Sequence, residues 1–225
     1  MQTRTATIIG ATGLIGSHLL DQLVQDDSIS QVKIIVRRPV TVSHAKARVV
    51  QIDFSDQVAF KQAIEGSDMV FCAVGTTQHK VKGDKAAYRK VDYDIPVTAA
   101  KFCAATGVEE FLLVSSVGAN SRSRNFYLKL KGEVEDAVRQ VNIASIAIFR
   151  PSMLLGNRQE VRQGERMAQA VMKALAFVIP ARYKPIEAGD VARAMIAAAK
   201  QQIRGVKVYH YGEIRELAAS AENVR

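Results

Sequence analysis

Apolar residues follow two alternating patterns along this chain. Short runs that are apolar at nearly every position predict strands buried on both faces, and longer segments with apolar residues at helical spacing predict helices that cover them. The expected strands are 6–9, 32–36, 49–52, 69–74, 111–114, 143–149 and 206–209, and the expected helices are 14–24, 56–65, 87–106, 124–140, 165–178, 188–200 and a terminal one. This alternation predicts an α/β fold with a doubly wound parallel sheet, a switch in strand order between the first and fourth strands, and a ligand crevice at the strands' carboxyl ends.

Three glycines lie where the first strand gives way to the first helix. Gly10, Gly13 and Gly16 form the spacing G-x-x-G-x-x-G. Residues without a β-carbon let the backbone approach a pyrophosphate and let the helix pack closely on the sheet, while the free N–H groups of the helix start face the anion. The turn predicts a dinucleotide cradle in a Rossmann-type sheet, and the alternative is a glycine-rich turn without a ligand.

The end of the second strand indicates which dinucleotide is bound. It runs into Arg37-Arg38-Pro39, without a carboxylate. An NAD-binding unit places Asp or Glu there for the ribose 2′-hydroxyl, whereas arginine accommodates a 2′-phosphate. We therefore predict NADP(H) as the cofactor, with a solvated basic turn as the alternative.

Polar residues also follow four other predicted strands. They are Asp53-Phe54, Gly75-Thr76-Thr77, Ser115-Ser116 and Arg150-Pro151-Ser152. Each pair or triplet has an ordinary structural explanation, as a helix cap, a turn or a local backbone-bonding group. Because the carboxyl ends of parallel strands meet at one edge of a sheet, their coincidence there predicts a binding site.

Tyr127 and Lys131 carry the expected chemistry. Four residues apart, they share one face of the predicted helix, one loop after the serines at 115–116. A phenol is a poor acid at neutral pH until a nearby ammonium group stabilises its anion and lowers its pKa. The pair predicts a proton donor and its activating lysine, although such spacing alone occurs by chance in many helices.

Composition narrows the classes of protein to consider. Of 225 residues 48% are hydrophobic, but no apolar run approaches the ~18 residues of a membrane span. The first strand begins almost at the N-terminus, which leaves no room for a signal peptide, so we expect a cytoplasmic protein. Cys72 and Cys103 fall in an apolar strand and an alanine-rich helix and are expected as buried thiols. No metal-ligand spacing is present.

A formal net charge of +9 raises the question of nucleic-acid binding. The basic residues fall in separate clusters at 37–48, 80–90 and 122–131, without the interleaved aromatic residues of single-strand binders. A positive field at one edge of the sheet attracts an anionic cofactor as readily as a polynucleotide. Nucleic acid and membrane are therefore not expected as partners.

Seven short segments together suggest a family. They are GATGLIG, IVRRP, the Asp53-Phe54 pair, AVGTT, LLVSSVGAN, YLKLKGEVE and FRPSMLLG. Over nearly its whole length the chain resembles the short-chain dehydrogenase/reductase superfamily, and it is most similar to the atypical NAD(P)-binding members of the Tat-interacting oxidoreductase-like group.

This resemblance assigns the adenine half of the cofactor. It implies that Arg37 and Arg38 hold the 2′-phosphate and that Asp53 and Phe54 flank the adenine. The pyrophosphate contacts that it implies are Gly10, Thr12, Gly13, Leu14, Ile15 and Gly16.

The resemblance assigns the nicotinamide half in the same way. Gly75 and Thr76 would line the nicotinamide-side ribose, and Tyr127 would be the proton donor with Lys131 as its partner on the ribose. Ser116 matches the catalytic serine better than Ser115, which is expected among the cofactor contacts. The backbone of Pro151, Ser152 and Met153 would reach the nicotinamide amide.

The chain departs from the larger sugar-nucleotide epimerases of the superfamily, which carry a longer serine-to-tyrosine segment and a substantial C-terminal domain. We expect residues 1–225 to form a single NAD(P)-binding Rossmann domain in which 151–225 contributes a small substrate-side cap. That size argues against a nucleotide-sugar substrate. Some apolar cap residues could line a pocket or pack: Met167, Val171, Met172, Leu175 and Phe177.

These observations predict an NADP(H)-dependent oxidoreductase that acts on a small carbonyl or alcohol through Ser116, Tyr127 and Lys131. The alternative is an NADPH-binding regulatory or protein-interaction module without turnover. A protein partner or a homodimer, through the helices at 87–106 or 124–140, is compatible with both.

Overall fold

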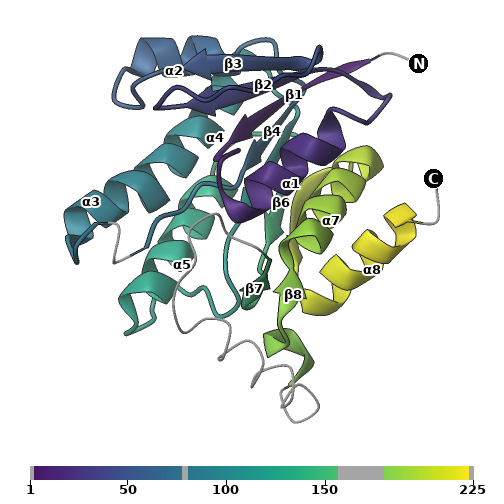
Figure 1. Ribbon diagram of the computed structural model, residues 1–225. Helices are drawn as coiled ribbons and strands as arrows, with labels where there is room; N and C mark the ends of the chain where they lie inside the picture. The colour runs from purple at the N-terminus through teal and green to yellow at the C-terminus, as the bar shows by residue number, and fades with distance from the viewer. Residues whose placement is uncertain (1–2, 78–80, 157–179, 223–225) are drawn as a thin grey trace.

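A computed structural model describes residues 3–77, 81–156 and 180–222 and contains a seven-stranded parallel sheet (Figure 1). The strand order is β3-β2-β1-β4-β5-β6-β9. The strands are β1 (Arg4–Ile9), β2 (Ile29–Val36), β3 (Ala47–Gln51), β4 (Met69–Cys72), β5 (Glu110–Val114), β6 (Ser145–Phe149) and β9 (Gly205–Tyr209). The predicted α/β fold, a Rossmann-type doubly wound parallel sheet, is confirmed.

The switch in strand order lies where the hydrophobic pattern predicted it. β1 pairs with β2 on one side and with β4 on the other, so that Ile8 lies between Ile34 and Phe71. The chain first builds outward to β3 and then crosses back to β4. The loops after β1 and β4 therefore leave the sheet in opposite directions, which is the position at which doubly wound sheets bind ligands.

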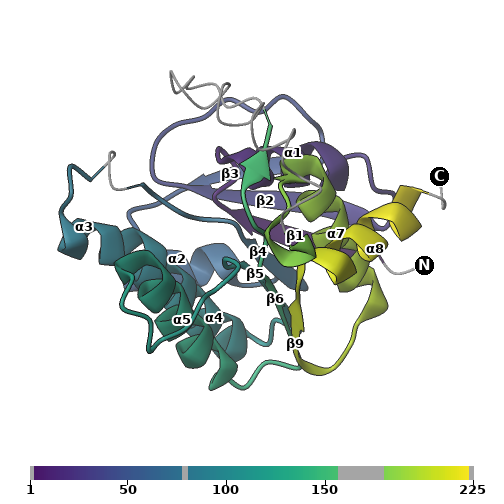
Figure 2. The ribbon, with the colours of Figure 1, turned by 90° about the horizontal axis from the view of Figure 1, so that it is seen from below.

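Helices cover both faces of the sheet (Figure 2). They are α1 (Leu14–Leu23), α2 (Gln57–Ile64), α3 (Lys85–Arg89), α4 (Ile95–Thr106), α5 (Phe126–Arg139), α7 (Ala188–Gln201) and α8 (Tyr211–Glu222). Ile8 packs in the cluster under α1 and α7, and its neighbour Ile9 packs in the cluster under α2 and α4. Because successive strand side chains point to opposite faces, both of which are covered, the central strand β4 is apolar and buried at every position.

The segment predicted as one helix over 87–106 is helical but not uniform. A π-helical turn, η1 (Lys90–Asp94), joins α3 to α4. Pro96 follows in the first turn of α4 and has no N–H, so one regular i→i−4 hydrogen bond is missing at this point. The turn carries Asp92, whose side chain is buried.

Much of the segment expected to form a cap belongs to the main body of the fold. β9 pairs with β6, and α7 packs on α1 and α8, so residues 188–222 extend the sheet and its cover. Only β7 (Leu154–Leu155), a 3-10 turn η2 (Ala181–Tyr183) and β8 (Ile186–Glu187) lie beyond the carboxyl edge among the described residues of 151–225. The predicted helix 165–178 and the five apolar cap residues within it lie outside the described residues.

Both cysteines are free and fully buried, as predicted. Burial raises the pKa of the Cys72 thiol to about 12, so this thiol is neutral at physiological pH. No helix in the described parts of the chain is both long and apolar enough to cross a membrane.

Candidate functional site

The glycine turn has a backbone geometry that only glycine permits at two of its three positions. Gly10 has φ +95°, and a β-carbon there would lie 2.7 Å from the carbonyl carbon of Ala73. A β-carbon on Gly16 would lie 2.0 Å from the carbonyl oxygen of Gly10. These positions hold the turn against the end of β4 and α1 against the turn.

Gly13 leaves the start of α1 open to an anion. It is the N-cap residue of α1, and no side chain accepts a hydrogen bond from the first turn. Gly13 itself donates its N–H to the Gly10 carbonyl oxygen at 2.9 Å. The uncapped N–H groups and the positive end of the helix dipole fit a pyrophosphate, which supports a dinucleotide at this turn.

The other predicted pyrophosphate contacts differ in exposure. Thr12 is exposed, Leu14 is half-buried, and the Ile15 side chain packs in the core, which leaves Ile15 only its backbone for a ligand. A β-carbon on Gly156 would lie 3.0 Å from Leu14 Cδ1. The chain leaving β7 therefore passes directly over the start of α1.

Arg37 and Arg38 follow β2 with exposed side chains. Among the residues that the structure describes, neither guanidinium group has a hydrogen-bond or ion-pair partner. Both are therefore available to an anion at the same edge of the sheet as the glycine turn. Their assignment to a 2′-phosphate stays a prediction.

Asp53 and Phe54 follow β3 at the same edge. Asp53 is exposed and accepts a hydrogen bond from the Ser55 N–H at 2.9 Å, which lowers the pKa of its carboxyl group. Asp53 does not cap the next helix, because Asp56 does. Phe54 packs edge-on against Phe60, with ring centroids 4.9 Å apart. The exposed Asp53 and half-buried Phe54 suit the border of an adenine site, which stays a prediction.

Two residues that sequence reasoning missed bind the backbone N–H and carbonyl oxygen of Thr76, just after Gly75. Asp92 accepts a hydrogen bond from the Thr76 N–H at 2.7 Å, and the Tyr88 hydroxyl donates to the Thr76 carbonyl oxygen at 3.2 Å. Tyr88 and Asp92 come from α3 and η1. The strand end expected to line the nicotinamide-side ribose is thereby held through both polar backbone groups of Thr76.

Asp92 also pairs with Lys131, the predicted catalytic lysine. Lys131 Nζ lies 3.1 Å from Asp92 Oδ1, and the two residues are 6% and 1% exposed. Burial lowers the pKa of Lys131, but the opposing effects of Asp92, Tyr127 and Cys72 are together larger, so the net shift is upward. Lys131 is therefore a buried, protonated cation with a carboxylate partner.

Tyr127 and Lys131 share one face of α5, as their spacing predicted. Lys131 Nζ lies 6.0 Å from the centroid of the Tyr127 ring. The Tyr127 side chain is half-buried, and its hydroxyl has no hydrogen-bond partner among the described residues. Within the described chain the hydroxyl is therefore available to a substrate, on the same helix face as the Lys131 ammonium group.

The two serines after β5 are not equivalent. Ser115 is buried, and its hydroxyl donates to Glu135 on α5 at 2.5 Å. Ser116 is half-buried, and its hydroxyl makes a long local bond of 3.3 Å to the Val117 carbonyl oxygen. Ser116 can exchange this weak contact for a substrate oxygen, whereas Ser115 is already committed to a buried partner.

The backbone after β6 retains few free polar groups. The Pro151 carbonyl oxygen accepts from Val117 and the Met153 carbonyl oxygen accepts from Ile186, at 2.9 and 3.0 Å. The Ser152 hydroxyl donates to the Lys184 carbonyl oxygen. Within the described chain, the N–H groups of Ser152 and Met153 and the Ser152 carbonyl are left for a ligand such as the nicotinamide amide.

The sequence offered little indication of Asp92 or Tyr88. Both lie inside a helical segment with several other polar and aromatic residues, and their partner Thr76 is at least 12 residues away. A weak signal was available for Asp92, because it is followed by an apolar segment and Pro96 in a helix that must pack on the sheet.

Comparisons with known proteins agree with this geometry. A family model described as NAD(P)H-binding matches residues 10–202. Protein HTATIP2 from Rattus norvegicus is 35% identical over 178 residues, which cover 78% of this chain and 73% of the rat protein. The mitochondrial protein FMP52 from Candida albicans is 32% identical over 204 residues, which cover 88% of this chain and 89% of its own.

Solved structures share the fold at low sequence identity. A UDP-N-acetylglucosamine 4-epimerase from Methanobrevibacter ruminantium, in complex with UDP-N-acetylmuramic acid, aligns with TM-score 0.71 and 17% identity over 100% of this chain and 83% of its own. The Bordetella bronchiseptica enzyme WbmH, in complex with NAD+, aligns with TM-score 0.72 and 18% identity over 97% of this chain and 80% of its own. At such identities the likeness concerns the fold alone.

Proposed function

The chain belongs to the NAD(P)H-binding family of atypical short-chain dehydrogenase/reductases, with HTATIP2 and FMP52 proteins as relatives, and from this premise we propose that it is an NADP(H)-dependent oxidoreductase acting on a small carbonyl or alcohol. One observation carries the proposal. Tyr127 presents a hydroxyl that has no partner in the described chain, on the helix face of the buried Lys131 ammonium group, and Lys131 is tied through Asp92 to the strand end at Thr76.

The fit of a dinucleotide rests on the glycine turn and on the open start of α1. Gly10, Gly13 and Gly16 would hold the pyrophosphate, Gly75 and Thr76 the nicotinamide-side ribose, and the free backbone groups at 152–153 the nicotinamide amide. When bound, the cofactor supplies the hydride.

The chain's own residues would handle the proton. Tyr127 would donate its hydroxyl proton to the carbonyl oxygen of the substrate, and Ser116 would donate a hydrogen bond to the same oxygen. Lys131 would stabilise the phenolate that remains and would contact the ribose. Asp92 keeps Lys131 in place and neutralises part of its charge, at a distance of 3.1 Å.

Cofactor choice gives a direct prediction. We expect NADPH to bind more tightly than NADH by about 1.5–3 kcal/mol, because Arg37 and Arg38, exposed and without partners among the described residues, would offer their guanidinium groups to the 2′-phosphate. Calorimetric titration of both cofactors, with Arg37→Ala and Arg38→Ala, measures the difference. Arg48→Ala is the matched control, since Arg48 is equally exposed but lies near the amino end of β3. Equal affinities that neither Arg37→Ala nor Arg38→Ala changes would remove the assignment.

The proposal itself is tested by NADPH oxidation across a panel of aldehydes, ketones and quinones. An oxidoreductase reduces at least one class with saturation kinetics. A regulatory module, the alternative, binds NADPH but reduces none of them. The panel starts with small members of each class, in keeping with the proposed small carbonyl or alcohol.

A further inference from the structure

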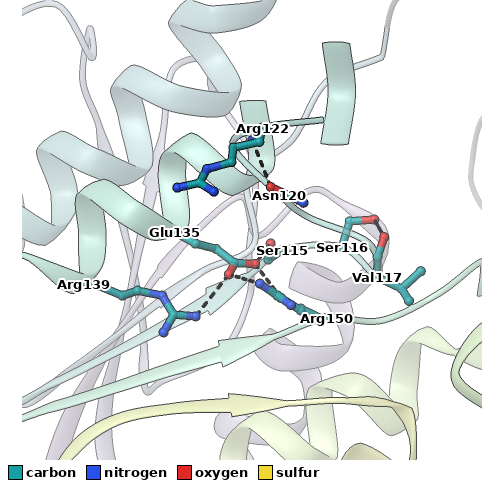
Figure 3. A network of polar contacts seen from close by, with 8 residues as sticks. All are labelled: Ser115, Ser116, Val117, Asn120, Arg122, Glu135, Arg139 and Arg150. Carbon is teal, nitrogen blue, oxygen red and sulfur yellow. Dashed lines mark hydrogen bonds and ion pairs between the residues drawn. The ribbon is translucent and has the colours of Figure 1, made fainter. Parts of the chain in front are cut away.

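Glu135 is a buried carboxylate that joins three segments of the site. It lies on α5, four residues after Lys131, and is 1% exposed. Oε1 accepts hydrogen bonds from the Ser115 hydroxyl at 2.5 Å and from Arg150 Nε at 2.9 Å. Oε2 accepts from Arg150 Nη2 at 2.6 Å and from Arg139 Nη2 at 3.3 Å. Figure 3 shows the two guanidinium groups approaching this carboxylate from different sides.

Two of the three partners, Ser115 and Arg150, stand next to a group with an expected role in the chemistry. Ser115 directly precedes Ser116, and Arg150 directly precedes the backbone segment 151–153. Glu135 itself extends the face of α5 that carries Tyr127 and Lys131 at four-residue intervals. One carboxylate therefore connects the serine loop, the segment after β6 and the helix of the tyrosine and lysine.

Main-chain hydrogen bonds join the ends of β5 and β6 directly, and in the part of the chain that the structure describes they reach α5 only further along the serine loop. The Ser115 N–H donates to the Phe149 carbonyl oxygen at 2.7 Å, and the Val117 N–H donates to the Pro151 carbonyl oxygen at 2.9 Å. These bonds hold the ends of β5 and β6 together but do not reach α5. The Asn120 N–H, later in the same loop, donates to the Leu128 carbonyl oxygen on α5 at 3.0 Å. The Glu135 side chain links Ser115 and Arg150, at the strand ends themselves, to α5.

A purely stabilising role explains this arrangement poorly. Removing a carboxylate and a guanidinium group from water costs free energy, and their mutual attraction often fails to exceed that cost. A well-packed apolar pair at the same place commonly gives the folded protein equal stability. An apolar pair, however, does not fix the angles between the groups that it joins. A bidentate Arg150 contact and a serine hydroxyl on the same carboxylate fix distances and angles between elements.

We propose that Glu135 is a positioning residue that holds Ser116 and the 151–153 backbone at the correct distance and orientation relative to Tyr127 and Lys131. The inference rests on the proposed function, because it concerns the geometry of the same site. Its effect falls on the nicotinamide side and not on the adenine side, since the glycine turn, Arg37 and Arg38 belong to other elements.

The test compares Glu135→Gln with Glu133→Gln. Glu133 lies on the same helix but forms a partly exposed ion pair with Arg89, so its replacement removes an equal charge outside the network. Ser115→Ala is a milder second variant, which deletes one hydrogen bond and leaves the Glu135–Arg150 pair intact. For each protein we would measure the melting temperature, NADPH affinity by calorimetry, kcat and KM with a responsive carbonyl, and the emission of bound NADPH.

We expect Glu135→Gln to bind NADPH within about threefold of wild type while kcat falls about 10²-fold, the loss typical of a misplacement near 1 Å. Ser115→Ala should show a smaller loss of kcat at an unchanged KM for NADPH and a near-normal melting temperature. The nicotinamide emission should shift in both variants. Glu133→Gln should match wild type throughout.

Other outcomes separate this inference from the proposed function. If wild type binds NADPH but reduces no carbonyl, the proposed function fails, and an emission shift in Glu135→Gln at unchanged affinity still supports positioning. Wild-type kcat and emission in a folded Glu135→Gln would overturn the inference. A second contradicting result would be a loss of NADPH affinity in Glu135→Gln and Ser115→Ala that follows the fall in their melting temperatures. That pattern indicates a structural role alone.

Discussion

Tyr127→Phe should reduce turnover of a responsive carbonyl by about 10²–10⁴-fold, the usual contribution of a positioned acid. NADPH affinity should stay nearly unchanged, because only a hydroxyl without a hydrogen-bond partner in the described chain is lost. The measurement is NADPH oxidation under saturating cofactor, together with a calorimetric titration of NADPH.

Tyr93→Phe is the matched control for that variant. Tyr93 lies in η1, and the centroid of its ring is 3.9 Å from Arg89 Cζ. It has no part in the proposed chemistry. It should keep wild-type kcat. Activity that survives in Tyr127→Phe would rule out the proposed proton donor.

Lys131→Met should lower the free energy of unfolding by about 3–5 kcal/mol, the range observed when one partner of a buried ion pair is removed. Asp92 would be left almost fully buried without its counter-charge. Urea unfolding with an unchanged m-value measures the loss. The same variant should also weaken NADPH binding and turnover, since it removes the proposed ribose contact.

The double variant Asp92→Asn with Lys131→Met isolates the charge as the cause. A neutral amide still accepts the Thr76 N–H but needs no cation, so the double variant should regain most of the lost stability. Activity should stay low in the double variant, because the lysine is still missing. A double variant no more stable than Lys131→Met would show that packing, not the unpaired carboxylate, dominates.

The stability deficit of Lys131→Met should also depend on pH. Burial raises the pKa of the Asp92 carboxyl group, and Lys131 is one of the groups that oppose this rise. The folded-state pKa of Asp92 already stands above the unfolded value, and without Lys131 it rises further, so the folded variant binds the extra proton earlier as pH falls. The deficit should therefore shrink from pH 7 toward pH 5 and be largest at higher pH. A deficit that grows on acidification would contradict an unpaired Asp92.

The sequence by itself determined the fold and the glycine turn after β1. Strands such as 32–36 are apolar on both faces, and this local pattern is sufficient to require a covered parallel sheet. Gly10 and Gly16 were identifiable because a steric requirement of the backbone permits only one residue type there. The spacing of Tyr127 and Lys131 was equally local, since an α-helix fixes which residues share a face.

Only the tertiary structure decided the partners of the buried charges. Lys131 pairs with Asp92 across 39 positions of sequence, and Ser115 meets Glu135 and Arg150 from separate elements. No periodicity marks such residues, because a buried charge is defined by what surrounds it after packing and not by its neighbours in the chain. Helix and strand patterns placed Tyr127, Lys131 and Ser116 on the right elements, and the packing of those elements decided which charged group each one meets.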